Sequence, residues 1–255
     1  MKRVLTAAIL APIVVWLVLW APGAAFLAVL ATVAVLCFRE YEGIIAAYGI
    51  VRPGLAAYAA GVILMFLPSD ATLFLVLLAL LFLAAGIAAA DLSQGLPRAG
   101  AAVLGVLYIF GAWRFAIPLR AVDPNWLMFA LAASWVGDTA AYYVGKNFGK
   151  HRMAPVVSPG KTWEGAAASL AGSVIFGVLY VGNLIPGVGA AAGAGIALAA
   201  NAAGQFGDLA ESAFKRGAGV KDSGTMLPGH GGWLDRVDSS LFAIPVVYFA
   251  VRYLM

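Results

Sequence analysis

Four polar side chains stand at a helical spacing late in an otherwise apolar chain. They are Asp208, Glu211, Ser212 and Lys215. The intervals i, i+3, i+4 and i+7 place them on one face of an α-helix, which Gly217 and Gly219 are expected to end. Two acids, a hydroxyl group and a cation on one face can hold a phosphate group or a metal ion. A solvated amphipathic face explains the same spacing.

The loop that follows is rich in glycine and charge. Its polar and special residues are Lys221, Asp222, Pro228, Gly229, His230, Gly231 and Gly232. Asp235 and Asp238 then present two carboxylates at i and i+3, with Arg236 between them, at the start of the last apolar segment. One or two carboxylates can bind a Mg²⁺ ion and leave coordination positions open for the phosphates of a substrate. The alternative is helix capping, because acids favour the first turn of a helix.

A second basic segment with several glycines runs from residue 145 to residue 164. It contains Gly145, Lys146, Gly149, Lys150, Ser158, Pro159, Gly160, Lys161, Thr162 and Glu164. Thr162 is expected to cap the next helix, and a helix start of this kind can bind phosphate. The run Gly160-Lys161-Thr162 is not a P-loop, because no glycine stands five residues before Gly160. A basic loop on the cytoplasmic side of a membrane explains the composition equally well.

The rest of the chain has the composition of a membrane protein. Apolar residues make up 63% of the 255 residues and charged residues only 11%, whereas a soluble domain carries about a quarter charged residues. Apolar runs of about twenty residues follow one another with little periodicity. We therefore predict an all-α, polytopic membrane helix bundle. The formal charge of +4 is dispersed among loops and does not indicate nucleic-acid binding.

About nine transmembrane helices are predicted in this bundle. They cover residues 4–20, 23–38, 55–68, 71–90, 99–118, 125–144, 165–184, 187–207 and 238–254. Most lysines and arginines fall in connections on one side, so the positive-inside rule places the N-terminus in the cytoplasm. The two longest polar segments, 145–164 and 208–237, then open onto the same cytoplasmic face.

One acid lies within a predicted span. Asp138 is surrounded in sequence by apolar residues. Inserting an ionisable side chain at such a position costs about 3 kcal/mol unless the side chain is paired or faces water. We therefore expect Asp138 to support the functional site. The alternative is that Asp138 caps or pairs with a neighbouring helix, with hydrogen bonds from Thr139, Tyr142 or Tyr143.

The stretch from Ser212 to Ser239 resembles the signature of the phosphatidate cytidylyltransferase family, also called CDP-diglyceride synthases. The matching residues are Ser212, Lys215, Arg216, Lys221, Asp222, Pro228, His230, Gly231, Gly232, Asp235, Arg236 and Asp238. Asp208 and Glu211 with their neighbours, and the loop from Ser158 to Gly165, are also similar to family segments. Gly160 stands where the family often has a second lysine. These motifs lie in residues 126–255, whereas residues 1–125 are similar to the family in hydropathy.

The resemblance implies a nucleotidyltransferase that converts CTP and phosphatidic acid into CDP-diacylglycerol and pyrophosphate in phospholipid biosynthesis. The catalytic residues are then Asp222, Asp235, Asp238, Lys221 and Arg236. Substrate contacts are expected from Lys161, Thr162, Ser212, Lys215, Arg216, His230, Gly231 and Gly232. One or two Mg²⁺ ions are expected on Asp222, Asp235, Asp238, Asp208 and Glu211, with Asp138 and Glu164 in support. Which acid binds metal and which orients substrate stays open.

The predicted topology and the resemblance together indicate a location and a domain organisation. Residues 1–255 form one integral membrane domain, with N-terminal spans in 1–125 and a catalytic half in 126–255. The protein is expected in a bacterial cytoplasmic membrane, with its active site facing the cytoplasm. The family further suggests a homodimer.

Two other functions fit parts of the pattern. A CTP-dependent lipid-alcohol kinase acting on polyprenol or phytol transfers the γ-phosphate and releases CDP instead of pyrophosphate. An ion-coupled transporter uses acids such as Asp138, Asp208 and Glu211 near the bilayer midplane. Most charges in this chain cluster toward one face, and no internal repeat is evident, which favours the cytidylyltransferase interpretation.

Overall fold

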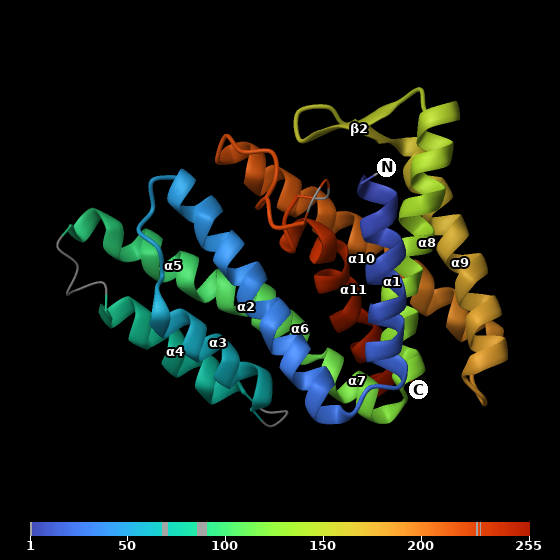
Figure 1. Cartoon of the computed structure of the whole chain (residues 1–255), viewed down its shortest axis with the longest axis horizontal. Helices are drawn as coiled ribbons and strands as arrows, with labels where there is room; N and C mark the ends of the chain where they lie inside the picture. The colour runs from blue at the N-terminus through green and yellow to red at the C-terminus, as the bar shows by residue number, and fades with distance from the viewer. Residues whose placement is uncertain (1, 68–70, 86–90, 228, 230) are drawn as a thin grey trace. The chain divides into compact units, whose positions relative to one another are not determined.

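The computed structural model describes residues 2–67, 71–85, 91–227, 229 and 231–255, with side chains from residue 8 onward. These residues are mostly helical and include a two-stranded hairpin (Figure 1), which confirms the predicted all-α class. The chain divides into two compact units, each described by itself. The first comprises Met1–Ala7, Pro22–Arg114 and Phe214–Arg236, and the second comprises Ala8–Ala21, Phe115–Ala213 and Val237–Met255.

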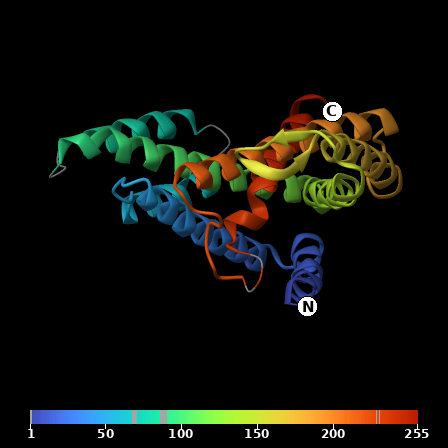
Figure 2. The same ribbon diagram turned by 90° about the horizontal axis from the view of Figure 1, so that it is seen from above.

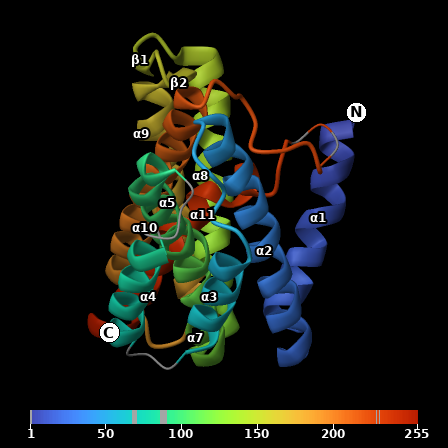
Figure 3. The ribbon, with the colours of Figure 1, turned by 90° about the vertical axis from the view of Figure 1, so that its left-hand side faces the viewer.

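The first unit contains the helices from α2 to α6. They are α2 (Gly23–Ala47), α3 (Leu55–Phe66), α4 (Thr72–Ala85), the short η2 (Leu92–Gln94), α5 (Gly95–Gly105), the π-helical η3 (Val106–Gly111) and α6 (Ala112–Arg114). Helix α4 packs along α5 (Figure 3), and α3 packs along η3. The buried ring of Phe38 contacts the rings of Tyr41 and Phe110. This aromatic core anchors the part of α2 that carries its polar residues.

The second unit contains most of α1 (Lys2–Leu19), α10 (Ala190–Gly217) and α11 (Leu234–Tyr253). It also contains α7 (Ala116–Val122), α8 (Pro124–Phe148), β1 (Arg152–Ala154), β2 (Ser158–Thr162) and α9 (Trp163–Leu184). Helices α8 and α9 run side by side. Small residues let the helices approach closely: a Cβ atom at Gly177 on α9 would lie 2.6 Å from the carbonyl oxygen of Gly193 on α10.

The basic segment 145–164 is predicted as a loop, but most of it has regular structure: α8 continues to Phe148, and residues 152–154 and 158–162 are strands. Strands β1 and β2 pair there as an antiparallel hairpin, with Arg152 opposite Thr162 and Ala154 opposite Ser158. Figure 2 shows the hairpin at the junction between α8 and α9. The sequence does not predict these strands, because the segment lacks the alternation of apolar and polar residues that is typical of a strand. Backbone pairing between the two strands forms the hairpin. The predicted cap is confirmed: the Thr162 hydroxyl oxygen accepts from the Gly165 amide at 3.1 Å.

Each predicted span coincides with a helical segment among the described residues, but several boundaries differ. Helix α2 continues to Ala47 where the span was predicted to end at 38, α10 continues to Gly217, and α11 begins at Leu234. Residues 68–70 and 86–90, at the ends of two predicted spans, lie outside the described residues. Among those described, the helices long and apolar enough to cross a membrane are Gly23–Ala47, Leu92–Val122 and Trp163–Leu184. The chain is therefore an all-α membrane protein.

Gly105 tests the packing of α5 against α2. A Cβ atom at this position would lie 2.8 Å from Cε2 of Phe38 and 2.9 Å from Cδ1 of Tyr41, so Gly105→Ala is expected to lower the melting temperature in detergent. The destabilisation expected from overpacking is about 1–3 kcal/mol. Gly43→Ala is the matched control, because Gly43 is exposed on α2 with nothing within 4 Å of the added methyl group. Equal melting temperatures for the two variants would contradict this packing.

Candidate functional site

The polar residues predicted on one helix do lie on α10. Asp208, Glu211, Ser212 and Lys215 all belong to this helix, which ends at Gly217 as expected. Gly219 follows with φ +73°. The amide of Val220 donates to the carbonyl of Lys215, and that of Gly219 donates to the carbonyl of Arg216, both at 3.0 Å. This is a Schellman-type helix end, and it turns the chain sharply into the loop that carries the rest of the motif.

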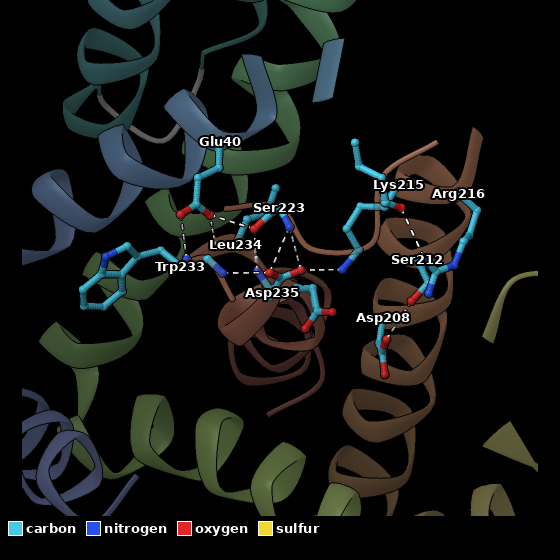
Figure 4. A network of polar contacts seen from close by, with 12 residues as sticks. Glu40, Asp208, Ser212, Lys215, Arg216, Ser223, Trp233, Leu234 and Asp235 are labelled. Carbon is cyan, nitrogen blue, oxygen red and sulfur yellow. Dashed lines mark hydrogen bonds and ion pairs between the residues drawn. The ribbon is translucent and has the colours of Figure 1, made fainter. Parts of the chain in front are cut away.

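An ion pair joins the end of α10 to the start of α11 within the first unit. The Nζ atom of Lys215 lies 2.5 Å from Oδ1 of Asp235, and the two side chains are only 10% and 5% exposed. The Asp235 carboxylate also accepts from the amides of Ser223, at 2.9 and 3.1 Å to its two oxygens, and of Gly232, at 2.8 Å. Figure 4 shows these contacts converging on Asp235. The cation and the carboxylate therefore hold each other in a fixed place.

The surroundings of Asp235 favour its charged form. Burial alone raises the pKa of this carboxyl group, but the hydrogen bonds from Lys215 and from the amides of Gly232 and Ser223 outweigh it, so the pKa lies below the usual range. A depressed folded-state pKa contributes stability above the ordinary carboxyl pKa, and that contribution is lost as the pH falls through the lowered value. At neutral pH the ion pair is intact.

Glu40 is part of this site, although no motif in the sequence indicates it. It lies on α2 with 5% exposure, and its carboxylate accepts from the hydroxyl of Ser223 at 2.8 Å and from the amides of Trp233 at 3.0 Å and Leu234 at 2.9 Å. The signal was available, because Glu40 stands near the end of a long apolar run, where an ionisable residue needs a partner. Glu40 falls outside the predicted span, which ends at residue 38.

The remaining charged residues of the signature stretch are exposed. Arg216 is on α10, Lys221 and Asp222 are in the loop, and Arg236 is on α11. Arg216 donates to the carbonyl of Val220 at 3.2 Å. Pro228 and His230 lie outside the described residues, so the contact predicted for His230 stays a prediction. Three cations and one acid of this stretch are thus exposed, whereas the Lys215–Asp235 pair is buried.

Gly231 and Gly232, predicted to contact substrate, have a packing reason to be glycine. Gly231 has φ +79°, a conformation that L side chains rarely adopt. A Cβ atom at Gly231 would collide with Oδ2 of Asp235, and one at Gly232 would collide with Oε2 of Glu40 and with the Ser223 hydroxyl. These glycines make room for the two buried carboxylates.

The second unit holds another group of predicted site residues. Nζ of Lys161 on β2 lies 2.7 Å from Oδ2 of Asp208, and the Ser212 hydroxyl donates to Oδ1 of the same aspartate at 3.3 Å. Nδ1 of His151 lies 2.6 Å from Oε1 of Glu164, which fastens the hairpin to the first turn of α9. The structure therefore brings Lys161, Asp208 and Ser212 together, and it places Thr162 and Glu164 at the adjoining helix start.

The other predicted acids of this unit differ in exposure. Glu211 on α10 is 2% exposed and Asp238 on α11 is 8% exposed. Oδ1 of Asp238 accepts from the amide of Ser239 at 2.7 Å, and a Cβ atom at Gly207 would lie 2.8 Å from the Asp238 carbonyl oxygen. Asp138 lies at an exposed position on α8.

The donor chemistry fits Mg²⁺, which prefers oxygen ligands and usually keeps waters or substrate phosphates in its shell. Asp208, Glu211, Asp222, Asp235 and Asp238 supply carboxylate oxygens of this kind. Among the described residues, no three His, Cys, Asp or Glu side chains gather into a ready-made metal site. These residues therefore fit a Mg²⁺ ion that is held by one or two carboxylates together with a phosphate-bearing substrate.

The helices and the charged residues together define an all-α membrane protein with charged polar segments between its apolar helices. Residues 1–254 match the model of the Cytidylyltransferase family, and the chain belongs to this family. The match extends beyond the C-terminal half, where the motifs lie.

Individual relatives agree with the family assignment. The chain is 35% identical to phosphatidate cytidylyltransferase of Brucella suis biovar 1 (strain 1330) over 253 residues, which are 96% of this chain and 91% of the relative. It is 41% identical to phosphatidate cytidylyltransferase of Staphylococcus aureus (strain COL) over 147 residues, 57% of this chain and 56% of the relative. For the protein of the same name in Bacillus subtilis (strain 168), identity is 40% over 156 residues, 59% of this chain and 57% of the relative. The match thus spans just over half the length of the latter two relatives.

Lys215 and Asp235 provide a test of the buried ion pair. Lys215→Met and Asp235→Asn each leave a buried polar partner uncompensated, so each is expected to lower the free energy of unfolding by about 3 kcal/mol. The double variant is expected to lose less than the sum of the single losses, because the two residues act as a pair. Thermal unfolding in detergent measures all three against Lys150→Met, which changes an exposed lysine. Strictly additive losses would show that the two side chains do not interact.

Proposed function

We propose that this protein is a CTP:phosphatidate cytidylyltransferase, which forms CDP-diacylglycerol and pyrophosphate. The observation that carries the proposal is the Lys215–Asp235 ion pair, which fixes a cation of the motif beside an exposed charged loop. Membership of the Cytidylyltransferase family and the names of the relatives support the choice of substrates. The proposed partners are CTP, phosphatidic acid and the lipid bilayer.

The reaction joins two polyanions. An oxygen of the lipid phosphate forms a bond to the α-phosphorus of CTP, the bond from that phosphorus to the oxygen bridging to the β-phosphorus breaks, and pyrophosphate leaves. A phosphate monoester has a second pKa of about 6, so it arrives mostly ionised and acts as its own nucleophile. The main task of the protein is to bring the phosphates together and to stabilise the charge that shifts to the leaving group.

Fixed cations perform most of that task. Lys161, Lys215, Arg216, Lys221 and Arg236 are the proposed phosphate-binding residues. Two of them are positioned by acids, Lys215 by Asp235 and Lys161 by Asp208. A cation held in place loses less entropy when it binds a phosphate, and its charge is already oriented for the transition state. Thr162, Ser212, Gly231, Gly232 and His230 are proposed to line the bound substrates.

The acids divide into two proposed roles. Asp222, Asp238, Asp208 and Glu211 are the proposed carboxylates for one or two Mg²⁺ ions. Bound Mg²⁺ would neutralise charge on the triphosphate and on the leaving pyrophosphate. Asp235 also offers oxygens, but its three donors indicate that it mainly positions Lys215. Asp138 and Glu164 are proposed to support the surrounding helices.

The proposed topology follows from the distribution of charge. Nine crossings with the N-terminus in the cytoplasm put most basic residues on the cytoplasmic side, as the positive-inside rule requires. CTP reaches the enzyme from water, whereas the lipid phosphate stays at the membrane interface, so the site is proposed to face the cytoplasm of a bacterial cell. The bacterial relatives support this location, and a homodimer is the proposed assembly.

The products distinguish the proposed reaction from the lipid-alcohol kinase. Purified protein in detergent, incubated with Mg²⁺, phosphatidic acid and α-³²P-labelled CTP, is expected to give a labelled lipid and an equivalent amount of pyrophosphate. Thin-layer chromatography and a pyrophosphate assay measure the two products. Polyprenol in place of phosphatidic acid is the control reaction. Release of CDP with a phosphorylated alcohol, or no labelled lipid from folded protein, would overturn the proposal.

Asp222 and Asp238 test the metal-binding role. Asp222→Asn and Asp238→Asn keep the side-chain volume but remove the charge, so turnover is expected to fall by a factor on the order of 10². The concentration of Mg²⁺ that gives half-maximal activity is expected to rise where activity stays measurable. Asp91→Asn is the control, because Asp91 is an exposed acid that caps η2, a role asparagine also fills. Full activity in both site variants at low Mg²⁺ would contradict the assignment.

A further inference from the structure

Glu40 is a buried acid that the motifs of the chain do not explain. It lies on α2 within Gly23–Ala47, a helix long and apolar enough to cross a membrane. An ionisable side chain in such a helix is costly unless it is compensated, and it usually marks a functional role. Its carboxylate accepts from three donors, two in the segment between α10 and α11 and one at the first residue of α11. A residue early in the chain is thus bound to the late signature stretch.

The donors to Glu40 include the start of α11. Trp233 immediately precedes this helix and Leu234 is its first residue, so their amides belong to the groups that a helix leaves unpaired at its N-terminus. The partial positive charge of the helix end stabilises an anion there. This is also the place where many proteins bind a phosphate group. In this protein the Glu40 carboxylate occupies it.

Ser223 connects Glu40 with Asp235. Its hydroxyl donates to Oε2 of Glu40 at 2.8 Å and accepts from the amide of Asp235 at 3.3 Å, while its own amide donates to the Asp235 carboxylate. Asp235 in turn pairs with Lys215 at 2.5 Å. Figure 4 shows this succession from Glu40 to Lys215. The position of a cation in the signature therefore depends on a carboxylate of α2.

Glycines on both sides of Glu40 show that the loop is built around it. A Cβ atom at Gly224 would lie 2.6 Å from Oε1 of Glu40. A Cβ atom at Gly232 would collide with Oε2. Contacts this short require the neighbour to move, so any side chain at either position would displace the carboxylate. The loop therefore packs against both carboxylate oxygens of Glu40, with Gly224 at Oε1 and Gly232 at Oε2.

We infer that Glu40 is a positioning residue for the reaction proposed above. It sets the placement of Ser223 and the first turn of α11, and through them the placement of Asp235 and Lys215. Because Glu40 already takes the amides of Trp233 and Leu234, substrate phosphates bind to side-chain cations and not to the N-terminus of α11. The inference rests on the proposed function for its effect on turnover.

Glu42 offers a matched control on the same helix. It is also an almost fully buried acid, with 7% exposure, and it also accepts hydrogen bonds, from the Gly54 amide at 2.7 Å and the Tyr58 hydroxyl at 2.9 Å. Its partners lie outside the signature stretch. Glu40→Gln and Glu42→Gln therefore make the same chemical change in α2. Only Glu40→Gln alters hydrogen bonds to the signature stretch.

Hydrogen exchange and kinetics together test the inference in the full-length protein in detergent. Glu40→Gln is expected to increase amide exchange in peptides covering residues 222–236 and to lower kcat by a factor on the order of 10², with little change in the KM for CTP. Glu42→Gln is expected to leave both properties close to those of the wild type, even if its melting temperature falls equally. Ser223→Ala is expected to lower kcat, and adding Glu40→Gln to it is expected to cost less than Glu40→Gln alone.

Two results would overturn the inference. One is unchanged exchange in residues 222–236 of Glu40→Gln, and the other is an equal loss of kcat in the Glu40 and Glu42 variants. If Glu40→Gln does not fold, Ser223→Ala decides the question, because it removes a single hydroxyl group from the same connection, and wild-type exchange and kcat in that variant would overturn the inference. Wild-type protein without cytidylyl transfer would defeat the proposed function, whereas the exchange comparison would still decide whether Glu40 positions the loop.

Discussion

Two buried carboxylates, Glu40 and Asp235, impose the constraint on which the first unit depends. A buried ionised group is tolerated only when hydrogen bonds or an opposite charge replace its water. Asp235 receives Lys215 and two backbone amides, and Glu40 receives a hydroxyl and two backbone amides. Those amides point at the carboxylates only when the loop between α10 and α11 has its folded course. Satisfying the charges and folding the loop are therefore one process.

This constraint gives the glycines of the motif a physical explanation. Gly224 and Gly232 lie against the Glu40 carboxylate, and Gly231 combines a left-handed backbone with close contact to Asp235. A larger residue at these positions would push an acid away from its donors and leave a buried charge unsatisfied. A pattern that resembles a substrate-binding loop in sequence is thus also a pattern for packing carboxylates. The two roles are compatible, because Arg216, Lys221 and Arg236 of the same stretch remain exposed.

Paired charges recur at the residues proposed to bind phosphate. Lys161 contacts Asp208 in the second unit as Lys215 contacts Asp235 in the first. Long lysine side chains have many rotamers, and an acid partner reduces that freedom before substrate arrives. Cytidylyl transfer between two polyanions requires positive charge in defined places more than it requires an acid or a base. A protein that fixes its lysines with aspartates meets that requirement.

The amino-acid sequence by itself determined the fold class, the helical segments, the cap at Thr162 and the end of α10 at Gly217 and Gly219. These features depend on composition, local periodicity and backbone preference, all of which act over a few residues. Tertiary structure decided the β1–β2 hairpin, the extension of α2 to Ala47 and the partners of Asp235. Only the tertiary structure shows that Glu40 belongs to the site, because the donors to this acid lie 183 to 194 positions further along the chain. No local pattern encodes such a pairing, which forms only when the folded chain brings a buried charge to the amides that can satisfy it.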